Sequence, residues 1–132
     1  MVQVMNQTGI LLIAHGSRNK GANDDLHDLA ARIKAQGQYS IVETSFLDLA
    51  APDIVSGGAA CVARGAHRVL MIPYFLSAGV HLLRDLGTAR DELSRLYPNV
   101  RFSLGPALGP HPLLDALISE RISELEHSER DG

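Results

Sequence analysis

Short runs of apolar residues alternate with longer amphipathic stretches along this chain. Each apolar run is too short to cross a membrane and is rich in branched side chains, which is typical of a strand buried on both faces. Each stretch between them repeats apolar residues every three to four positions, as a helix packed on one side does. The expected strands are 10–14, 39–47, 69–72 and 100–104, and the expected helices cover about 22–33, 52–66, 82–96 and 112–125.

This alternation predicts an α/β fold of the βαβαβαβα type, an open parallel sheet with helices on both faces and right-handed crossovers. We expect a flavodoxin-like strand order of 2-1-3-4, which reverses between the first and third strands. The 132 residues suit one domain, 1–132, with a core of about 9–126 and a charged tail, 127–132, that frays. Gly57 and Gly58 weaken the second helix, so we expect them to serve close packing there.

Charge and cysteine content exclude several classes of protein. A net charge of −3 and a pI near 6.0 argue against a nucleic acid or an anionic membrane as the main partner. The single cysteine, Cys61, allows no disulfide within the chain, fits a reducing compartment and is more typical of a small buried side chain than of a nucleophile. The first residues lack the pattern of a signal peptide. We therefore expect a cytoplasmic protein.

Polar side chains follow each of the expected strands. His15 follows the first, Asp48 the second and His111 the fourth, and His81 lies in the expected loop after the third. The carboxyl ends of parallel strands meet at one edge of a sheet, where α/β proteins bind their ligands. In the 2-1-3-4 order, His15 and His81 flank the point where the strand order reverses, although 66 residues separate them.

Imidazoles with one carboxylate and no thiolate suit Fe, Co, Ni or Zn, and neutral imidazoles also accept protons near pH 7. This set therefore fits a site that binds a metal and removes protons better than a site built around a nucleophile. Each residue also has a structural interpretation. A histidine at a strand end is often only half-buried, Asp48 could begin a turn, and His111 could be a rigid turn residue between two prolines.

Basic residues and glycines accompany these candidates. Arg18, Lys20 and Arg84 lie near the same edge and could meet an acidic ligand, as could the free N–H groups of the helix N-termini. Gly16 and Gly79 would permit a close backbone approach or an unusual backbone conformation.

Four segments resemble motifs of the sirohydrochlorin chelatases of the CbiX and SirB type, the short class II chelatases of tetrapyrrole pathways. These segments are 13–18 (IAHGSR), 42–48 (VETSFLD), 72–81 (IPYFLSAGVH) and 105–112 (GPALGPHP). They occur in order and at compatible spacing, and the likeness extends from about Gly9 to Leu125. Together they are far more specific than the HGSR sequence alone.

The resemblance implies insertion of Co²⁺, Fe²⁺ or Ni²⁺ into sirohydrochlorin without ATP, in cobalamin, siroheme or nickel-cofactor biosynthesis, with no cofactor beyond the substrate metal. His15 and His81 match the family's catalytic histidines, and with Asp48 they are the expected metal ligands. Asp48 stands where glutamate is common in this family. The side chain that carries the carboxylate is therefore shorter by one methylene group. Asp85 also matches, although Leu86-Gly87 replaces a more usual Ile-Pro.

The resemblance also implies a homodimer with a cleft between protomers. The residues expected to bind the tetrapyrrole are Ser17, Arg18, Gly79, Arg84 and His111. Two other interpretations use some of the same residues. A carrier that binds metal or tetrapyrrole without turnover would use the same residues. A histidine phosphatase would place arginine directly before His15, where this chain has Ala14.

Overall fold

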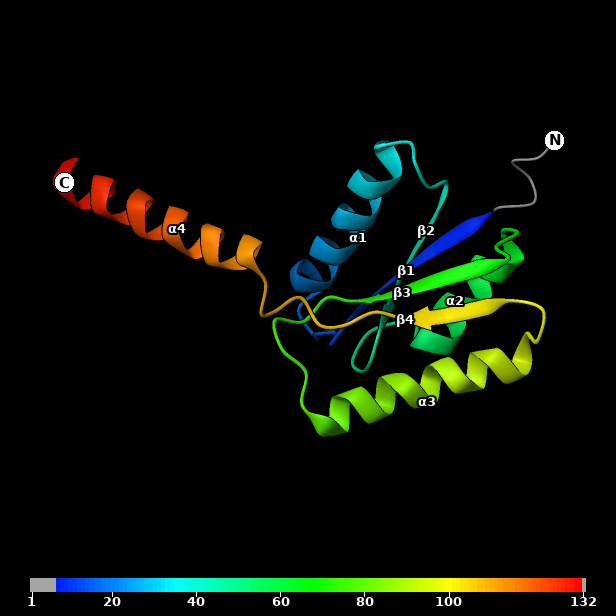
Figure 1. Cartoon of the computed structure of the whole chain (residues 1–132). Helices are drawn as coiled ribbons and strands as arrows, with labels where there is room; N and C mark the ends of the chain where they lie inside the picture. The colour runs from blue at the N-terminus through cyan, green and yellow to red at the C-terminus, as the bar shows by residue number, and fades with distance from the viewer. Residues whose placement is uncertain (1–6, 132) are drawn as a thin grey trace.

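A single parallel sheet with the strand order β2-β1-β3-β4 forms the centre of the molecule, as the sequence predicted. The computed structural model describes residues 7–131, the side chain of residue 131 excepted, so residues 1–6 and 132 of the expected domain lie outside it. Strand and helix alternate along the whole described chain (Figure 1). The elements are β1 (Thr8–Ala14), α1 (Lys20–Ala35), β2 (Ile41–Phe46), α2 (Ile54–Ala63), β3 (Arg68–Pro73), α3 (Val80–Leu96), β4 (Arg101–Leu104) and α4 (Pro112–Asp131).

The central strand β1 is buried on both faces because helices lie on both sides of the sheet. Leu11 and Ile13 point into a core formed with α2 and α3, while Ile10 and Leu12 point into a second core formed with α1. This explains why the strand reads as an uninterrupted apolar run. β1 pairs with β2 on one side and with β3 on the other, and β4 extends the sheet beyond β3.

The glycines of α2 allow this helix to lie close to the sheet, which confirms the expectation from the sequence. A Cβ on Gly57 would lie 2.9 Å from the Cβ of Ser45 and 3.1 Å from the carbonyl oxygen of Thr44. A Cβ on Gly58 would lie 2.6 Å from the side chain of Leu93 on α3. The same helix buries Cys61 completely, so this residue is a core side chain, as predicted.

Four details differ from the sequence predictions. β2 is shorter than 39–47 at both ends, and α2 begins after Pro52, with Asp53 as its N-cap. α3 begins at Val80, so His81 lies in its first turn and not in a loop. The tail that was expected to fray is helical through residue 131. Within it, an ion pair between Arg130 and Glu126 joins two successive turns of the helix.

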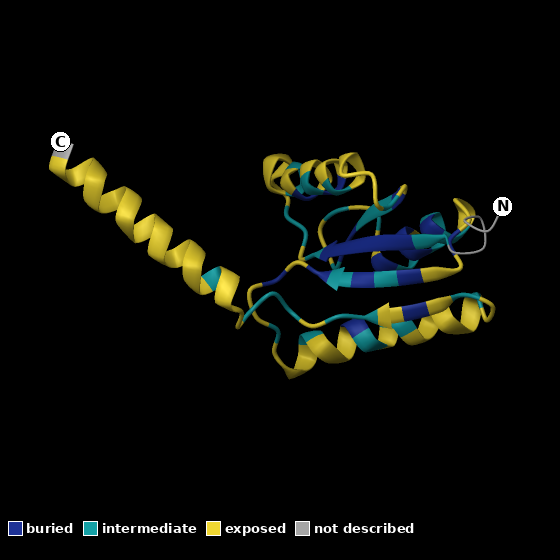
Figure 2. Cartoon of the chain, turned by 45° about the horizontal axis from the view of Figure 1, so that its top comes forward, coloured by how far each residue is buried: buried dark blue, intermediate teal, exposed yellow. Residues whose placement is uncertain are grey.

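The last helix, α4, projects away from the body of the molecule. In Figure 2 it is exposed along almost its whole length, and Leu114 is its only partly buried residue among those with a described side chain. The apolar stripe predicted for it is present, but it packs on no strand of the sheet. Within the described residues, no helix combines the length and the apolar character that crossing a membrane requires.

Candidate active site

The loops that follow the strands are joined to one another by backbone hydrogen bonds. The amide of Asp48 donates to the carbonyl of His15 (3.0 Å), and the amide of Tyr74 donates to Ile13 (2.7 Å). The amide of Leu108 donates to Phe75 (2.8 Å), which connects the loop after β4. The carboxyl edge of the sheet is therefore one continuous surface, and all four candidate residues come from it or from the helix start beside it.

His15 is the first residue after β1 and its side chain is exposed. Its ring packs edge-on against Phe75, with ring centroids 4.4 Å apart, so one side of the imidazole is supported by the core. Gly16 follows with a φ of 93°, a conformation that favours glycine. A Cβ here would collide with the carbonyl oxygen of Asp48, so the close approach expected at Gly16 is confirmed.

The segment after Gly16 is fixed by side chains of α1. The amide of Ser17 donates to Asn23 Oδ1 (2.9 Å), and Asn23 Nδ2 donates back to the carbonyl of Ser17 (2.7 Å). Ser17 Oγ accepts a hydrogen bond from the amide of Asn19 (3.0 Å), and Asn19 in turn caps α1 through the amide of Gly21. Arg18 lies between these anchors with an exposed side chain.

The backbone of Asp48 is hydrogen-bonded to that of His15, and the Asp48 side chain is exposed. One carboxylate oxygen, Oδ1, accepts a hydrogen bond from the amide of Leu49 (2.8 Å). Leu49 itself has a φ of 65°, which is uncommon for a non-glycine residue. The local turn thus orients the carboxylate and leaves Oδ2 without a protein donor among the described residues.

His81 occupies the first turn of α3 and is exposed. The N-cap, Gly79, has an ordinary φ of −80° and makes no side-chain cap, so the first amides of α3 are open. The unusual backbone conformation expected at Gly79 is therefore absent, and a Cβ there would meet nothing within 4 Å. A close approach of a ligand to this backbone stays a prediction. Arg84 lies one turn further along α3 and has no ion-pair partner within residues 7–131.

His111 acts as a helix cap in this structure. Its ring Nδ1 accepts a hydrogen bond from the amide of Leu113 (3.1 Å), and its carbonyl accepts from Leu114 (3.0 Å) at the start of α4. The structural interpretation of this residue therefore has an observed basis, and ligand binding by its Nε2 stays a prediction.

Two hollows lie along this edge. One, of about 240 Å³, is lined by His15, Ser17, Asn23 and Tyr74, together with apolar residues of α1. The other, of about 410 Å³, contains the carboxylates Asp48, Asp53 and Asp85. The side chains of His15, His81 and Asp48 do not form one cluster, because no three His, Cys, Asp or Glu side chains of the described chain lie close enough to hold a metal.

Sequence reasoning missed Asn23 and Phe75. Asn23 binds the loop of Ser17, and Phe75 supports the His15 ring. An asparagine one turn into an expected helix is a weak signal for such a bond, because its side chain competes for nearby backbone groups. Nothing in the sequence pattern pointed to Phe75.

A scan against protein-family models decides the family. The model described as CbiX matches residues 9–125, nearly the whole chain. The chain belongs to the CbiX family of sirohydrochlorin chelatases. Membership agrees with the four motif segments, which all fall inside the matched range.

Curated and solved relatives agree with this family. The chain is 33% identical over 125 residues to the chloroplastic sirohydrochlorin ferrochelatase of Arabidopsis thaliana, covering 94% of this chain and 56% of the relative. It is 33% identical over 117 residues to a sirohydrochlorin cobaltochelatase of Priestia megaterium, covering 89% and 38%. The chain thus spans about half the length, or less, of these two relatives.

A solved structure has the same fold. The sirohydrochlorin chelatase SirB from Bacillus subtilis subspecies spizizenii, in complex with cobalt, superposes with a TM-score of 0.82 at 29% identity. The match covers 89% of this CbiX-family chain and 50% of that chain.

Proposed function

We propose that this chain inserts a divalent metal ion, Co²⁺, Fe²⁺ or Ni²⁺, into sirohydrochlorin without ATP, in the reducing cytoplasm that its single buried thiol suits. The observation that carries the proposal is the family match over residues 9–125, which includes every loop of the carboxyl edge. The metal is a substrate here and no other cofactor is needed. The relatives include one named a ferrochelatase and one named a cobaltochelatase, so an experiment has to identify the metal that this chain inserts.

Metal insertion requires loss of two pyrrole N–H protons while the incoming ion gives up its waters. His15 and His81 are proposed to hold the metal over the ring or to accept these protons, and Asp48 is the proposed third ligand or orienting carboxylate. Each of these side chains is exposed and therefore accessible to a ring laid against the edge. The Asp48 oxygen that accepts no protein hydrogen bond is the one available to a cation.

The substrate carries several carboxylates, and basic groups at this edge can bind them. Arg18 and Arg84 are exposed, and neither forms an ion pair among residues 7–131. The open amides of the first turn of α3 favour an anion as well. Leu76, in the loop after β3, and Val80, directly before His81, are exposed and offer apolar surface to the macrocycle.

One copy of this edge leaves the site open. The larger hollow is only about 410 Å³, the smaller lies below the usual range of about 300–1,000 Å³ for a ligand pocket, and the histidines are exposed. A macrocycle bound here would keep one face in water unless a second surface covered it. We therefore include a homodimer in the proposal, in which a second copy provides the opposite wall.

The test is anaerobic incubation with sirohydrochlorin and Fe²⁺, Co²⁺ or Ni²⁺ separately, following the absorbance change against the uncatalysed rate. We expect many turnovers per chain, whereas a carrier would stop at stoichiometric binding. His15→Ala and His81→Ala should each reduce kcat at least a hundredfold. His67→Ala is the matched control, because His67 is exposed at the opposite edge of the sheet. Unchanged rates in both active-site variants would reject the assignment.

A further inference from the structure

Another hollow lies at the amino edge of the sheet, the end opposite the candidate active site. Its volume of about 530 Å³ exceeds that of either hollow at the carboxyl edge and falls within the usual range of about 300–1,000 Å³ for a ligand pocket. Apart from Pro98 and Val100, the residues that line it are polar, and none of them is a carboxylate. The hollow therefore suits a polar ligand better than an apolar one.

The register of the sheet places two arginines side by side at this hollow. Thr8 on β1 pairs with Arg68 on β3, and Arg68 pairs with Arg101 on β4, so these residues form one row across three strands. All three line the hollow. Nη2 of Arg68 donates a hydrogen bond to Oγ1 of Thr8 (3.0 Å). This bond holds one of the two guanidinium groups in place.

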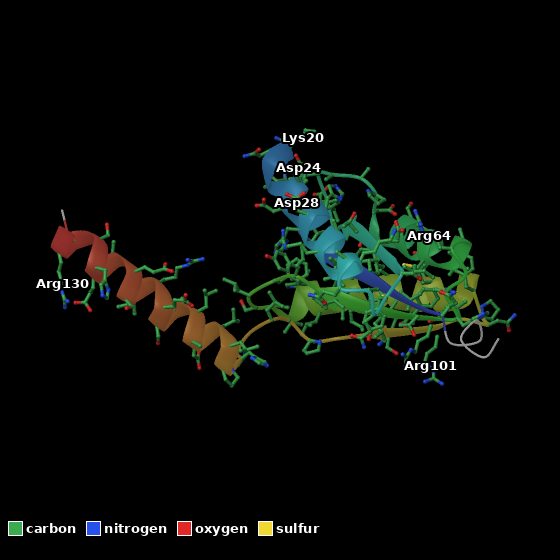
Figure 3. All side chains as sticks on the ribbon, turned by 90° about the horizontal axis from the view of Figure 1, so that it is seen from above. Lys20, Asp24, Asp28, Arg64, Arg101 and Arg130 are labelled. Atoms are coloured by element: carbon green, nitrogen blue, oxygen red, sulfur yellow. The ribbon has the colours of Figure 1, made fainter. Side chains whose placement is uncertain are left out.

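The two guanidinium groups have no counter-charge within residues 7–131. Neither Arg68 nor Arg101 forms an ion pair there. In Figure 3 Arg101 extends outward from the ribbon, well away from the carboxylates of Asp24 and Asp28 on α1. Like charges directly opposite each other on neighbouring strands are destabilising. An anion bound between the two arginines would remove this repulsion.

Backbone hydrogen bonds hold the strand starts at this hollow together. The amide of His67 donates to the carbonyl of Gln7 (3.0 Å), and the amide of Arg101 donates to the carbonyl of His67 (3.2 Å). The amide of Val100 donates to the carbonyl of Tyr97 (3.0 Å), which closes the turn before β4. The polar side chains are therefore carried by a fixed backbone, and a ligand would not have to order the chain in order to bind.

The side chains of the lining define the class of ligand. A guanidinium group is a planar fork of N–H donors that binds the paired oxygens of a phosphate or a carboxylate. Gln7 and Asn99 add carboxamide groups, which both donate and accept hydrogen bonds. Two guanidinium groups without a counter-charge match a ligand that carries two or more negative charges.

We propose that this hollow binds a small polyanion, a molecule whose phosphate or carboxylate groups lie between Arg68 and Arg101. The site is separate from the proposed metal insertion, because β1 extends about 20 Å from Thr8, at the hollow, to Ala14, beside the loops of the carboxyl edge. A ligand that binds only the folded chain also stabilises it by mass action.

The first test is isothermal titration calorimetry with inorganic pyrophosphate and with citrate, at an ionic strength held constant with NaCl. Pyrophosphate represents a phosphate-bearing ligand and citrate a carboxylate-bearing one, so the tighter probe identifies the class. We expect saturation at one molecule per chain. Lack of saturable binding of both probes would overturn the proposal.

The second test uses variants of the two arginines. Arg68→Gln and Arg101→Gln should each raise the Kd of the tighter probe at least tenfold, because each removes a charge-assisted contact. Arg32→Gln is the matched control, since Arg32 is exposed at the end of α1 and does not line the hollow. Equal effects of all three variants would show only an attraction to net charge and would overturn the site.

The geometry of the contact is tested by Arg101→Lys, which keeps the charge and loses the planar fork. The Kd should rise several-fold. An unchanged Kd would mean that the anion is attracted diffusely and is not held between the two side chains.

Nuclear magnetic resonance locates the anion, because the carboxyl edge also carries basic groups. Pyrophosphate should shift the amide signals of residues 67–69 and 99–102. Shifts confined to residues 16–18 and 79–83 would place the anion at the proposed active site and contradict the proposal.

The arginines could instead serve only to complement the carbonyl groups at the ends of α2 and α3, which lead into β3 and β4. In that case Arg101→Gln would lower the thermal unfolding midpoint without any ligand. Under the proposal, this variant keeps or raises the ligand-free midpoint, and pyrophosphate raises the midpoint of the wild type more than that of the variant. A lower midpoint in the variant, with no response of the wild type to pyrophosphate, would reject the anion site.

Discussion

Gly16 illustrates how a single residue can position two parts of the candidate site. Its φ of 93° and the carbonyl of Asp48 against its Cα leave no room for a side chain. The HGSR segment therefore needs glycine for a steric reason, besides any contact with a ligand. His15 precedes it and Asp48 lies across from it, so a displacement here moves both.

We expect Gly16→Ala to destabilise the fold by about 1–3 kcal/mol and to reduce metal insertion, because the new methyl group forces the two loops apart. Gly37→Ala is the control. Gly37 has a similar φ of 88°, but a Cβ there would meet nothing within 4 Å. Urea unfolding measures both variants. Equal losses of stability would mean that backbone conformation alone matters at Gly16.

For single residues, the sequence predictions held where the end of a strand determines where the residue lies. His15 and Asp48 lie at the expected edge because their strands end there. It failed for Gly79, whose conformation is ordinary, since a glycine in a sequence does not reveal whether its freedom is used. It also missed Phe75, because a contact between the ring of His15 and an aromatic residue 60 positions away leaves no periodic pattern.

The burial of Cys61 has a chemical consequence. Burial raises the pKa of its thiol to about 12, and the nearby Glu43 carboxylate adds to the increase, against a smaller opposing effect of Arg64. The thiolate is the reactive form, so a buried thiol with this pKa is inert near neutral pH. Core packing therefore accounts for this residue.

At the scale of elements, α2 owes its position to its N-cap and its glycines. Asp53 Oδ1 accepts a hydrogen bond from the amide of Ser56 (2.8 Å). This bond and a further one from the Ser56 side chain hold the pKa of Asp53 below its ordinary value. The partial positive charge at the start of a helix also favours a carboxylate at this position.

We expect Asp53→Ala to cost about 1 kcal/mol of stability at pH 7. Because the folded pKa is lowered, the contribution of the charge is present above the unfolded pKa of about 3.9 and is lost as the pH falls below it. Urea unfolding of the wild type and Asp53→Asn at pH 7 and pH 3 measures this difference. A gap between the two proteins that widens in acid would contradict the assignment.

The glycines of α2 give a prediction with an internal control. Gly57→Ala should destabilise the protein by about 1–3 kcal/mol, because contact with Ser45 and the Thr44 carbonyl outweighs the gain in helix propensity. Gly87→Ala in α3 should stabilise it by up to about 1 kcal/mol, since a Cβ there meets nothing within 4 Å. Thermal unfolding compares the two. Stabilisation by both would show that α2 can move away from the sheet.

At the scale of the whole molecule, the alternation of apolar runs and helical stripes was enough to predict the fold class, whereas the strand order was taken from the flavodoxin-like pattern and is confirmed by the structure. The position of α4 could not be predicted in this way. Its stripe indicates that one face is to be buried, but periodicity does not say against which surface or in which chain. The short connection before α4 is held to the segment after β3 by backbone hydrogen bonds. It therefore sets the direction of α4 only once the fold has formed.

The backbone bonds between the loops of the carboxyl edge have an evolutionary consequence. Amides and carbonyls that bind each other are not free to bind a cation, so under the proposed function the choice of metal would rest on a few exposed side chains. Such side chains can be exchanged without refolding the scaffold beneath them. A lineage could thus change from one transition metal to another by single substitutions, such as lengthening the arm at Asp48 to glutamate, while the architecture stays the same.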